Sequence, residues 1–299
     1  MRWPLGHLVR TRLVPLLVAT LVVTGSTAAT NMLRDPVTRY LSGQVVIGIN
    51  GNHPGWSYPR GDPDGFDVEL ARFLAHKYGF RMKLVPLSPD QRETKLRNGD
   101  VDLVIANFSI DGKSWLERGR KRLDVLDFAG PYFKDNSGVM YSEDKLRQVD
   151  PSLDAIPADH VCAANGTTAQ DYLGGQGVPE DEVDCFRRFA DKTDLRIVGV
   201  VTDQAILTSY AHEFGGTAIP AIWKDNNPSR YPISKERYGI GMPNGNPELC
   251  RELTKAINEF LSGGRSSPWQ RAFDNHLYGV SDPEDHKPAQ AESQLCDHN

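Results

Sequence analysis

Polar residues that can bind charged groups follow several apolar runs of this sequence. Thr167 and Thr168 follow Gly166 at the expected start of a helix, where free backbone N–H groups and the helix dipole favour a carboxylate. Asp203 comes directly after the apolar run 197–201 and opens the next expected helix. Each of these residues can also be a helix N-cap, a role that is compatible with ligand contact. The pattern indicates groups that bind an anion at one point and a cation at another.

Signatures of enzymatic or metal chemistry are missing from the sequence. It contains no G-x-S-x-G elbow, no P-loop pattern and no C-x-x-C pair, and its eight histidines never fall at metal-ligand spacing. We therefore expect no catalytic residues, no metal site and no cofactor.

Two hydrophobic periods alternate in the first part of the chain. The run 45–49 is continuously apolar and β-branched, which is typical of a strand buried on both faces of a parallel sheet. Apolar residues then recur at helical spacing over 66–78, and Gly79 supplies a helix stop. A strand at 82–85, a helix after Pro89 and a strand at 101–106 continue this order. The alternation predicts a parallel α/β lobe.

The same alternation restarts after Tyr132. We expect strands at 139–141, 160–164, 197–201 and 238–242, and helices at 167–173, 203–214, 247–261 and 268–277. The strand at 238–242 reads as a return to the first lobe. We therefore predict lobe 1 over 41–137 plus 235–278, lobe 2 over 138–234, and a polar C-terminal tail over 279–299.

Length and composition agree with two lobes in a water-soluble protein. The 299 residues are twice the usual domain size of roughly 150 residues. A hydrophobic share of 39% and a charged share of 24% exclude a polytopic membrane protein, a coiled coil and a wholly disordered chain. The net charge of -5 gives no electrostatic attraction to nucleic acid, which we do not expect as a partner.

The N-terminus has the layout of a secretory signal. Arg2, Arg10 and Arg12 precede an uncharged run at 13–23, and small residues follow at 25–29. We expect residues 1–29 to be a signal peptide or, as the alternative, an uncleaved membrane anchor. The protein is then exported and extracellular or attached to the cell surface. No cysteine stands directly after the apolar run, where a lipoprotein signal would have one, and this argues against a lipoprotein.

Export makes the four cysteines readable as two disulfides, because an oxidising compartment permits them and their number is even. Three pairings are possible. Cys162 with Cys185 and Cys250 with Cys296 is favoured, because each bond then closes a loop of tens of residues within one region.

Seven short motifs occur in an order and spacing that resemble one family. They are 65–71 (GFDVELA), 96–103 (LRNGDVDL), 107–110 (NFSI), 127–132 (DFAGPY), 166–168 (GTT), 201–203 (VTD) and 238–241 (YGIG). Together they resemble the polar amino-acid solute-binding proteins of ABC importers, and the nearest subgroup is similar to the glutamate-binding proteins of actinobacteria. The resemblance implies a two-lobed type II periplasmic-binding-protein fold with two crossing strands at a hinge, an α/β class. It also implies a monomer, an amino-acid ligand and an ABC permease in the membrane as partner.

The resemblance assigns roles to particular residues. Those that would contact the main chain of the ligand are Asn107, Ser109, Thr167, Thr168, Thr202 and Asp203, with Asp203 on the ammonium group. For the ligand's main-chain carboxylate the resemblance favours Arg118, with Arg120 and Arg122 as alternatives, because an insertion separates this basic run from Ser109.

Two further residues concern the ligand's side chain. Arg92 matches an arginine that pairs with a side-chain carboxylate in glutamate and aspartate binders, which suggests glutamate or another acidic or polar amino acid. A serine of those relatives is replaced here by Pro89, with Ser88 one place away. Trp56 lies in a loop that supplies a wall over the ligand, or else belongs to the core.

Two alternative functions stay open at this point. The same bilobed module, held by an uncleaved anchor, can act as an amino-acid sensor for a membrane partner. The fold also hosts dehydratases of cyclic amino acids, although this sequence carries no catalytic signature.

Overall fold

A mixed sheet frames the computed structural model, which describes residues 40–57, 61–150, 158–173, 177–180, 182–214, 220–221, 235–280 and 282–297. Within these residues the strand order is β2-β1-β3-β9-β4-β7-β5-β6, and β8 pairs with β4 outside this path. The strands are β1 (Gln44–Asn50), β2 (Arg81–Leu87), β3 (Leu103–Val104), β4 (Leu126–Tyr141), β5 (Val161–Ala164), β6 (Val178–Glu180), β7 (Gly199–Asp203), β8 (Pro220–Ala221) and β9 (Lys235–Pro243).

The segment 1–29, predicted to be a signal peptide or an anchor, lies outside the described residues. Among the helices that the structure does describe, none has the length and apolar character needed to span a bilayer.

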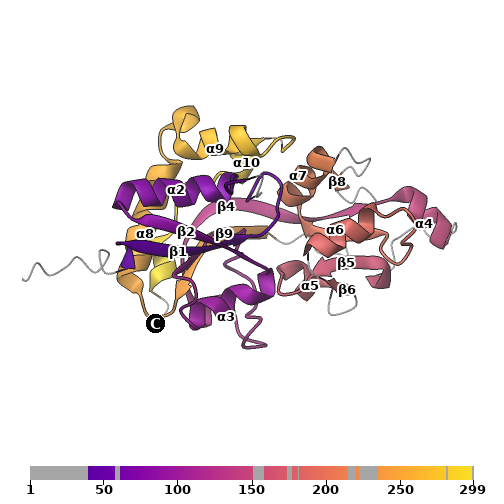
Figure 1. The fold of residues 1–299 in the computed structure, drawn as a ribbon, viewed down its shortest axis with the longest axis horizontal. Coiled ribbons are helices and arrows are strands. Elements are labelled where there is room, and N and C mark those ends of the chain that lie inside the picture. The colour runs from indigo at the N-terminus through magenta and orange to yellow at the C-terminus, as the bar shows by residue number, and fades with distance from the viewer. Residues whose placement is uncertain are drawn as a thin grey trace, which may run out of the picture. The chain divides into compact units, whose positions relative to one another are not determined.

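Parallel pairing of β1 with β2 and β3 builds the first lobe (Figure 1). Ile47 lies opposite Leu84 of β2 and Leu103 of β3, and its side chain is fully buried. This agrees with the continuous apolar run that predicts a strand covered on both faces. Because the three strands are parallel, their carboxyl ends meet at one edge of the sheet, where ligands bind in open α/β sheets.

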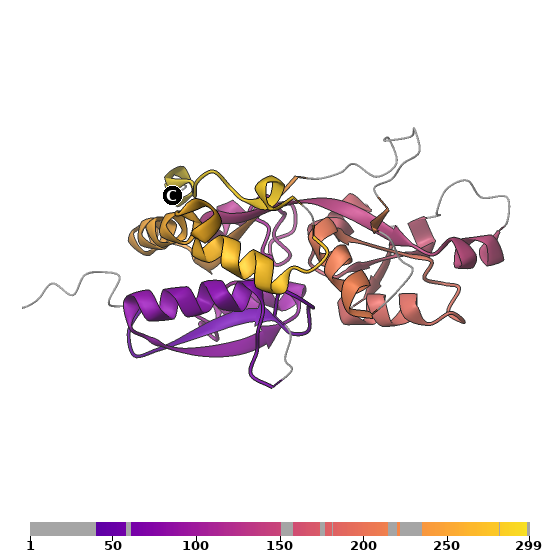
Figure 2. The ribbon, with the colours of Figure 1, turned by 90° about the horizontal axis from the view of Figure 1, so that it is seen from above.

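Helices pack against both parts of the sheet. They are α2 (Phe66–Tyr78), α3 (Arg92–Arg97), α4 (Glu143–Val149), α5 (Thr168–Tyr172), α6 (Glu182–Ala190), α7 (Gln204–Phe214), α8 (Pro247–Leu261), α9 (Pro268–His276) and α10 (Pro283–His286). Helix α2 ends at Gly79, whose φ of 72° lies in the left-handed region that glycine adopts without strain. Helix α9 lies beside α2 (Figure 2).

Two strands connect the lobes. The first part of β4 pairs antiparallel with β9, from Leu126 opposite Pro243 to Asn136 opposite Lys235. The last part of β4 pairs with β7 of the second lobe, from Ser137 opposite Asp203 to Tyr141 opposite Gly199. Strand β4 therefore crosses from the first lobe to the second, and β9 leads back. The predicted strand 139–141 is only the last part of β4. The sequence pattern does not indicate the earlier part of this strand, because Gly130 and Pro131 interrupt its apolar residues. The residue boundaries of the lobes stay a prediction.

The second lobe is a smaller sheet in which β5 pairs parallel with β6 and β7. Cys162 of β5 and Cys185 of α6 form a disulfide across 23 residues of sequence, as predicted. This bond ties β5 to α6, the helix that precedes β7.

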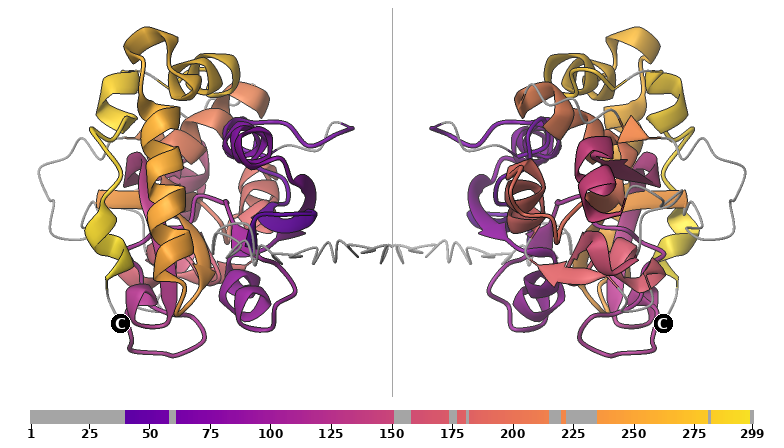
Figure 3. Two further views of the ribbon diagram at one scale, coloured as in Figure 1. Left: turned by 90° about the vertical axis from the view of Figure 1, so that its left-hand side faces the viewer. Right: turned by 90° about the vertical axis from the view of Figure 1, so that its right-hand side faces the viewer.

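The second expected disulfide joins Cys250 of α8 to Cys296 near the C-terminus. It fastens the polar tail, whose Leu295 is also buried, against α8 (Figure 3). Glu292 of the same segment makes an ion pair with Arg237 of β9 at 2.8 Å. The tail thus packs on the first lobe over 282–297.

Candidate ligand-binding site

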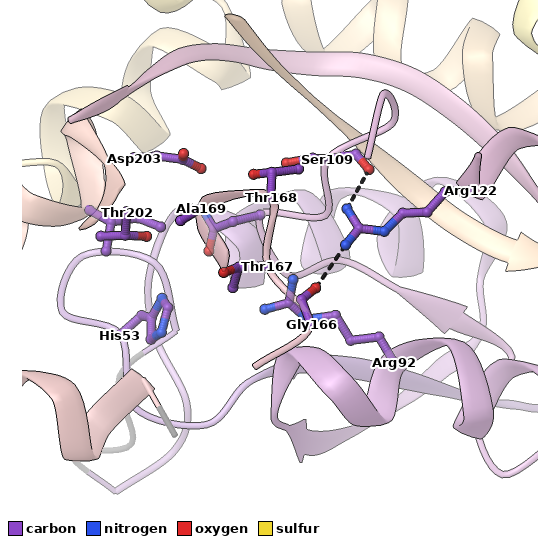
Figure 4. Close-up of a pocket in the computed structure, with 12 residues that line it drawn as sticks. His53, Arg92, Ser109, Arg122, Gly166, Thr167, Thr168, Ala169, Thr202 and Asp203 are labelled. Atoms are coloured by element: carbon purple, nitrogen blue, oxygen red, sulfur yellow. Dashed lines mark hydrogen bonds between the residues drawn. The ribbon is translucent and has the colours of Figure 1, made fainter. Parts of the chain in front are cut away.

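A pocket is lined by residues of both lobes (Figure 4). Its lining residues are His53, Arg92, Asn107, Ser109, Arg122, Gly166, Thr167, Thr168, Ala169, Thr202, Asp203 and Ile206. Seven of the nine ligand-binding residues predicted from the sequence are among them, and the other two, Trp56 and Arg118, are not.

The first lobe contributes residues that follow its parallel strands. His53 follows β1, Arg92 opens α3 after β2, and Asn107 and Ser109 follow β3. Ser109 also forms an isolated β-bridge with Tyr238 of β9, which fixes its backbone at the start of the crossing strands. These side chains share the pocket because the carboxyl ends of neighbouring parallel strands lie together.

The second lobe contributes the residues that follow β5 and β7. Thr167 is the N-cap of α5: its hydroxyl accepts from the backbone N–H of Gln170 at 3.3 Å and donates to the carbonyl of Ala164 at 2.6 Å. Thr168 is buried next to it, and Thr202 and Asp203 end β7. The N-cap role predicted as an alternative for Thr167 is therefore present in the structure, and Thr167 also lines the pocket.

Asp203 lies within a buried network of acidic groups. The hydroxyl of Tyr238 donates to Asp203 Oδ2 at 2.5 Å and also lies 3.3 Å from Asp135 Oδ2. Asp135 Oδ2 accepts from the backbone N–H of Ala205 at 2.9 Å, at the start of α7. Burial, together with the charges of Asp203 and Asp135, raises the pKa of Tyr238, so the hydroxyl keeps its proton and donates it. Burial raises the pKa of Asp135 to about 7, and Asp203 is the carboxyl of this pair that lines the pocket, where a cation can neutralise its charge.

Arg122 supplies the opposite charge from the first lobe. Its guanidinium donates to the carbonyl of Ser109 at 3.0 Å and to the carbonyl of Gly166 in the second lobe at 2.8 Å, and it lies 4.9 Å from the centre of the Phe108 ring. Glu93 lies 3.4 Å from its Nε, and both side chains are buried. Burial lowers the pKa of Arg122 and Glu93 opposes this shift, but an arginine remains protonated in proteins.

The structure places Arg122, one of the two alternatives, in the pocket and leaves Arg118, the favoured arginine, outside it. Arg118 is exposed, outside the pocket, with its guanidinium 5.8 Å from the Trp115 ring. The backbone N–H of Arg122 donates to the carbonyl of Gly112 at 2.9 Å, so the residues between them form a closed loop. Counting forward from Ser109 through this loop ends at an arginine outside the pocket, whereas counting back from β4 reaches Arg122.

Trp56 belongs to the core and does not form a wall over the pocket. Its side chain is fully buried and packs edge-on against Phe66, Phe133 and Tyr238. His53, three residues earlier, is the member of this loop that lines the pocket, with its ring 5.9 Å from that of Tyr210. The sequence signal that could have indicated His53 is its place in the loop that follows β1, which ends at Asn50.

A buried carboxyl supports the turn that carries Asn107 and Ser109. Asn107 has a φ of 46°, a strained value for a residue with a side chain. Its backbone N–H donates to Asp67 Oδ2 at 3.2 Å, and Tyr132 donates to Asp67 Oδ1 at 2.8 Å. Burial raises the pKa of Asp67 to about 7, although both donors oppose the shift.

This raised pKa predicts that stability falls as the pH rises. Between the unfolded pKa of 3.8 and the folded value near 7, the folded protein binds more protons at Asp67 than the unfolded chain does. By linkage, the free energy of unfolding decreases through this window, by about 4 kcal/mol at most for one such group. We expect Asp67→Asn to lose less stability than the wild type between pH 5 and pH 8, measured by urea denaturation. The exposed Asp144→Asn should follow the wild type, and equal pH dependence of all three proteins would contradict the assignment.

One cluster among the described residues has metal-ligand spacing, but arginine already contacts it. Ligand atoms of Asp64, Glu69 and His276 lie within 4.8 Å of one another. Arg72 pairs with both carboxylates at 2.7 Å. The arrangement is therefore an ion-pair network at the α2–α9 contact.

The fold and the pocket together define a bilobed binding protein. Residues 45–270 match the sequence pattern of the bacterial extracellular solute-binding proteins, family 3, and the chain belongs to this family. It is 25% identical over 238 residues to the glutamate-binding protein GluB of Corynebacterium glutamicum, covering 75% of this chain and 76% of GluB. It is 24% identical over 213 residues to the glutamine-binding protein GlnH of Bacillus subtilis, covering 69% and 70%.

Solved structures confirm the predicted fold class. The solute receptor for L-cysteine of Neisseria gonorrhoeae matches with a TM-score of 0.66 at 23% identity, covering 84% of this chain and 98% of the receptor. An ancestral amino-acid-binding protein, described as a precursor of cyclohexadienyl dehydratase, matches with a TM-score of 0.60 at 18% identity, covering 79% and 96%. The two-lobed type II periplasmic-binding-protein fold with two crossing strands is therefore present.

Proposed function

We propose that this protein captures an acidic amino acid outside the cell and delivers it to an ABC permease in the membrane. The observation that carries this proposal is the presence of Arg122 and Asp203, two buried and opposite charges from different lobes, in one pocket. An amino-acid zwitterion that enters a desolvated pocket needs both, because an unpaired buried charge is costly.

The geometry supports one orientation of the ligand. The ammonium group pairs with Asp203, and the main-chain carboxylate lies against Arg122, Ser109 and Thr168. In Figure 4, Ser109 and Thr168 lie between Asp203 and Arg122. Arg92, drawn on the far side of Gly166 from Ser109, is the remaining cation of the lining and suits a side-chain carboxylate. The names of GluB and GlnH, a glutamate and a glutamine binder, support a ligand of this size and polarity.

The same reasoning extends to the setting of the protein. Membership of an extracellular solute-binding family supports export, with residues 1–29 as signal peptide or anchor. The relatives that name an activity are binding proteins, which supports binding without catalysis. A monomer suits this role, since both lobes of one chain line the pocket. An anchored sensor would use the same site, and a dehydratase would release a keto acid from a cyclic amino acid, which an assay of product detects.

Calorimetry with the twenty amino acids tests the proposal. We expect glutamate or aspartate to bind tightest, neutral amino acids to bind more weakly, and lysine and arginine to be rejected. Absence of binding by every amino acid, or tightest binding of a cationic one, would overturn the proposal.

The role of Arg92 gives a separate prediction. Arg92→Ala should weaken an acidic ligand by about 2 to 5 kcal/mol, since the ligand's side-chain carboxylate loses its charged partner. Glutamine should lose much less. Arg97→Ala, at the exposed end of the same helix, is the matched control and should bind like the wild type. Unchanged glutamate affinity in Arg92→Ala would remove the argument for an acidic ligand.

A further inference from the structure

Asn107 holds a buried hydrogen-bond donor that no atom of the described residues accepts. The residue is 6% exposed and lines the pocket. Its side-chain Nδ2 has no partner in the described part of the chain, whereas its Oδ1 accepts from Asn50 Nδ2. Buried polar atoms are almost always paired in native proteins, so an exception at a pocket indicates a partner supplied by a ligand.

The orientation of this amide follows from Arg92. A guanidinium only donates hydrogen bonds, so the oxygen of Asn50 must face it, and Arg92 Nη2 donates to Asn50 Oδ1 at 2.5 Å. The NH₂ group of Asn50 then faces Asn107 and donates a hydrogen bond to the oxygen of the Asn107 side-chain amide. The NH₂ group of Asn107 is left at the end of this row, which we name the amide relay (Arg92, Asn50 and Asn107).

Backbone contacts hold both amides of the relay in place. The carbonyl of Asn50 accepts from the hydroxyl of Ser57 at 2.6 Å. The backbone N–H of Asn107 donates to Asp67 at 3.2 Å, which secures its positive φ. The relay therefore presents the Asn107 NH₂ group as a donor from a fixed backbone. If the side-chain amide of Asn107 alone rotated, its NH₂ group would face the NH₂ group of Asn50, and two donors would meet.

We propose that the amide relay makes Asn107 a specificity residue, whose side-chain NH₂ donates to a hydrogen-bond acceptor on the side chain of the bound amino acid. This rests on the proposed function and adds to it, because the sequence resemblance assigned Asn107 only to the main chain of the ligand. The relay favours carboxylate or carbonyl oxygens and rejects ammonium and guanidinium groups, which would place donor against donor. Arg92 thus selects the ligand in two ways, through its own charge and through the direction it imposes on Asn50 and Asn107.

A double-mutant cycle tests the relay. Asn50→Asp replaces the amide by a group with acceptor oxygens only, so Arg92 and Asn107 must both donate to the introduced carboxylate. Asn107 then presents its oxygen to the pocket. Asn107→Leu, a change of similar volume, should weaken glutamate about tenfold in the wild-type background, where it removes a donor. In the Asn50→Asp background the same change should cost nothing or improve affinity, because it removes a repelling oxygen.

This comparison cancels the charge that Asn50→Asp introduces beside Arg92, since both members of the second pair carry it. Asn98→Asp, an exposed change of the same charge on the same lobe, should leave glutamate affinity unchanged. An equal loss from Asn107→Leu in both backgrounds would overturn the relay. If Asn50→Asp does not fold, unchanged glutamate affinity in Asn107→Leu alone overturns it. A wild-type protein that binds no amino acid would instead refute the proposed function.

Discussion

Asp203→Ala is expected to abolish the binding of every amino acid, whatever its side chain. All amino acids share the ammonium group, and Asp203 is the carboxylate that reaches the pocket at the end of β7. Without it the ligand's buried cation has lost its partner, at a cost of about 3 to 5 kcal/mol, which lowers affinity by a factor of roughly one hundred or more. Calorimetry with glutamate, aspartate and glutamine measures the loss.

The neighbours of Asp203 define the controls. Tyr238 can still donate to Asp135 in the variant, so the fold should survive, and far-ultraviolet circular dichroism checks this. Asp144→Ala, an exposed acidic residue of the second lobe, should bind like the wild type. If Asp203→Ala kept glutamate within tenfold of wild-type affinity, the ammonium site would have to lie elsewhere. Because the Arg92 variant should spare neutral ligands and this one should not, the two experiments separate the shared and the specific parts of the ligand.

The sequence predicted those parts of the fold that local patterns determine. The run 45–49 and the Gly79 stop indicate β1 and α2 because strand burial and helix termination are read from neighbouring residues. Both disulfides follow from the number of cysteines and from loop length. Ser109 was named through the resemblance of its motif to the family, and Asp203 also by its place directly after an apolar run.

Long-range packing decides the features that the sequence did not indicate. The size of Trp56 and its place in a loop allow either a core or a pocket position, and only the packing of Phe66 and Phe133 against it decides between them. Asp67 stands in the first turn of α2, where an acidic side chain commonly faces solvent and favours the helix dipole, yet it is fully buried and holds the Asn107 turn. No local pattern states that a helix-start acid will face inward, because the partners Tyr132 and Asn107 lie 65 and 40 residues away.

Arg118 shows why an insertion makes it unreliable to locate a site residue by its sequence distance from a motif. A backbone hydrogen bond between Gly112 and Arg122 closes the loop between them, and the backbones of Lys113 and Lys121 form an isolated antiparallel β-bridge within it. Residues in such a loop add to the sequence distance without moving the anchored ends apart. Strand β4 begins only four residues after Arg122, so the sheet fixes that arginine and leaves Arg118 in the solvent.

Arg122→Met is therefore expected to remove both ligand binding and part of the stability. In the proposed orientation the change deletes the cation that faces the ligand's main-chain carboxylate, so affinity for every amino acid should fall by a factor of about one hundred or more. The change also leaves the buried Glu93 without its arginine partner. Glu93 keeps its hydrogen bonds from Ser114 and from the backbone of Trp115. We therefore expect the free energy of unfolding to fall by about 3 kcal/mol, the lower end of the range for a buried ion pair that loses one partner.

A second substitution separates these two effects. Adding Glu93→Gln to Arg122→Met removes the unpaired charge, so urea denaturation should show part of the stability restored, while calorimetry should still detect no binding. Arg118→Met, on the same loop but exposed, should change neither quantity. If Arg118→Met abolished binding and Arg122→Met did not, the arginine first favoured by the sequence would be the carboxylate ligand, and the carbonyls of Ser109 and Gly166 would be the structural partners that Arg122 serves.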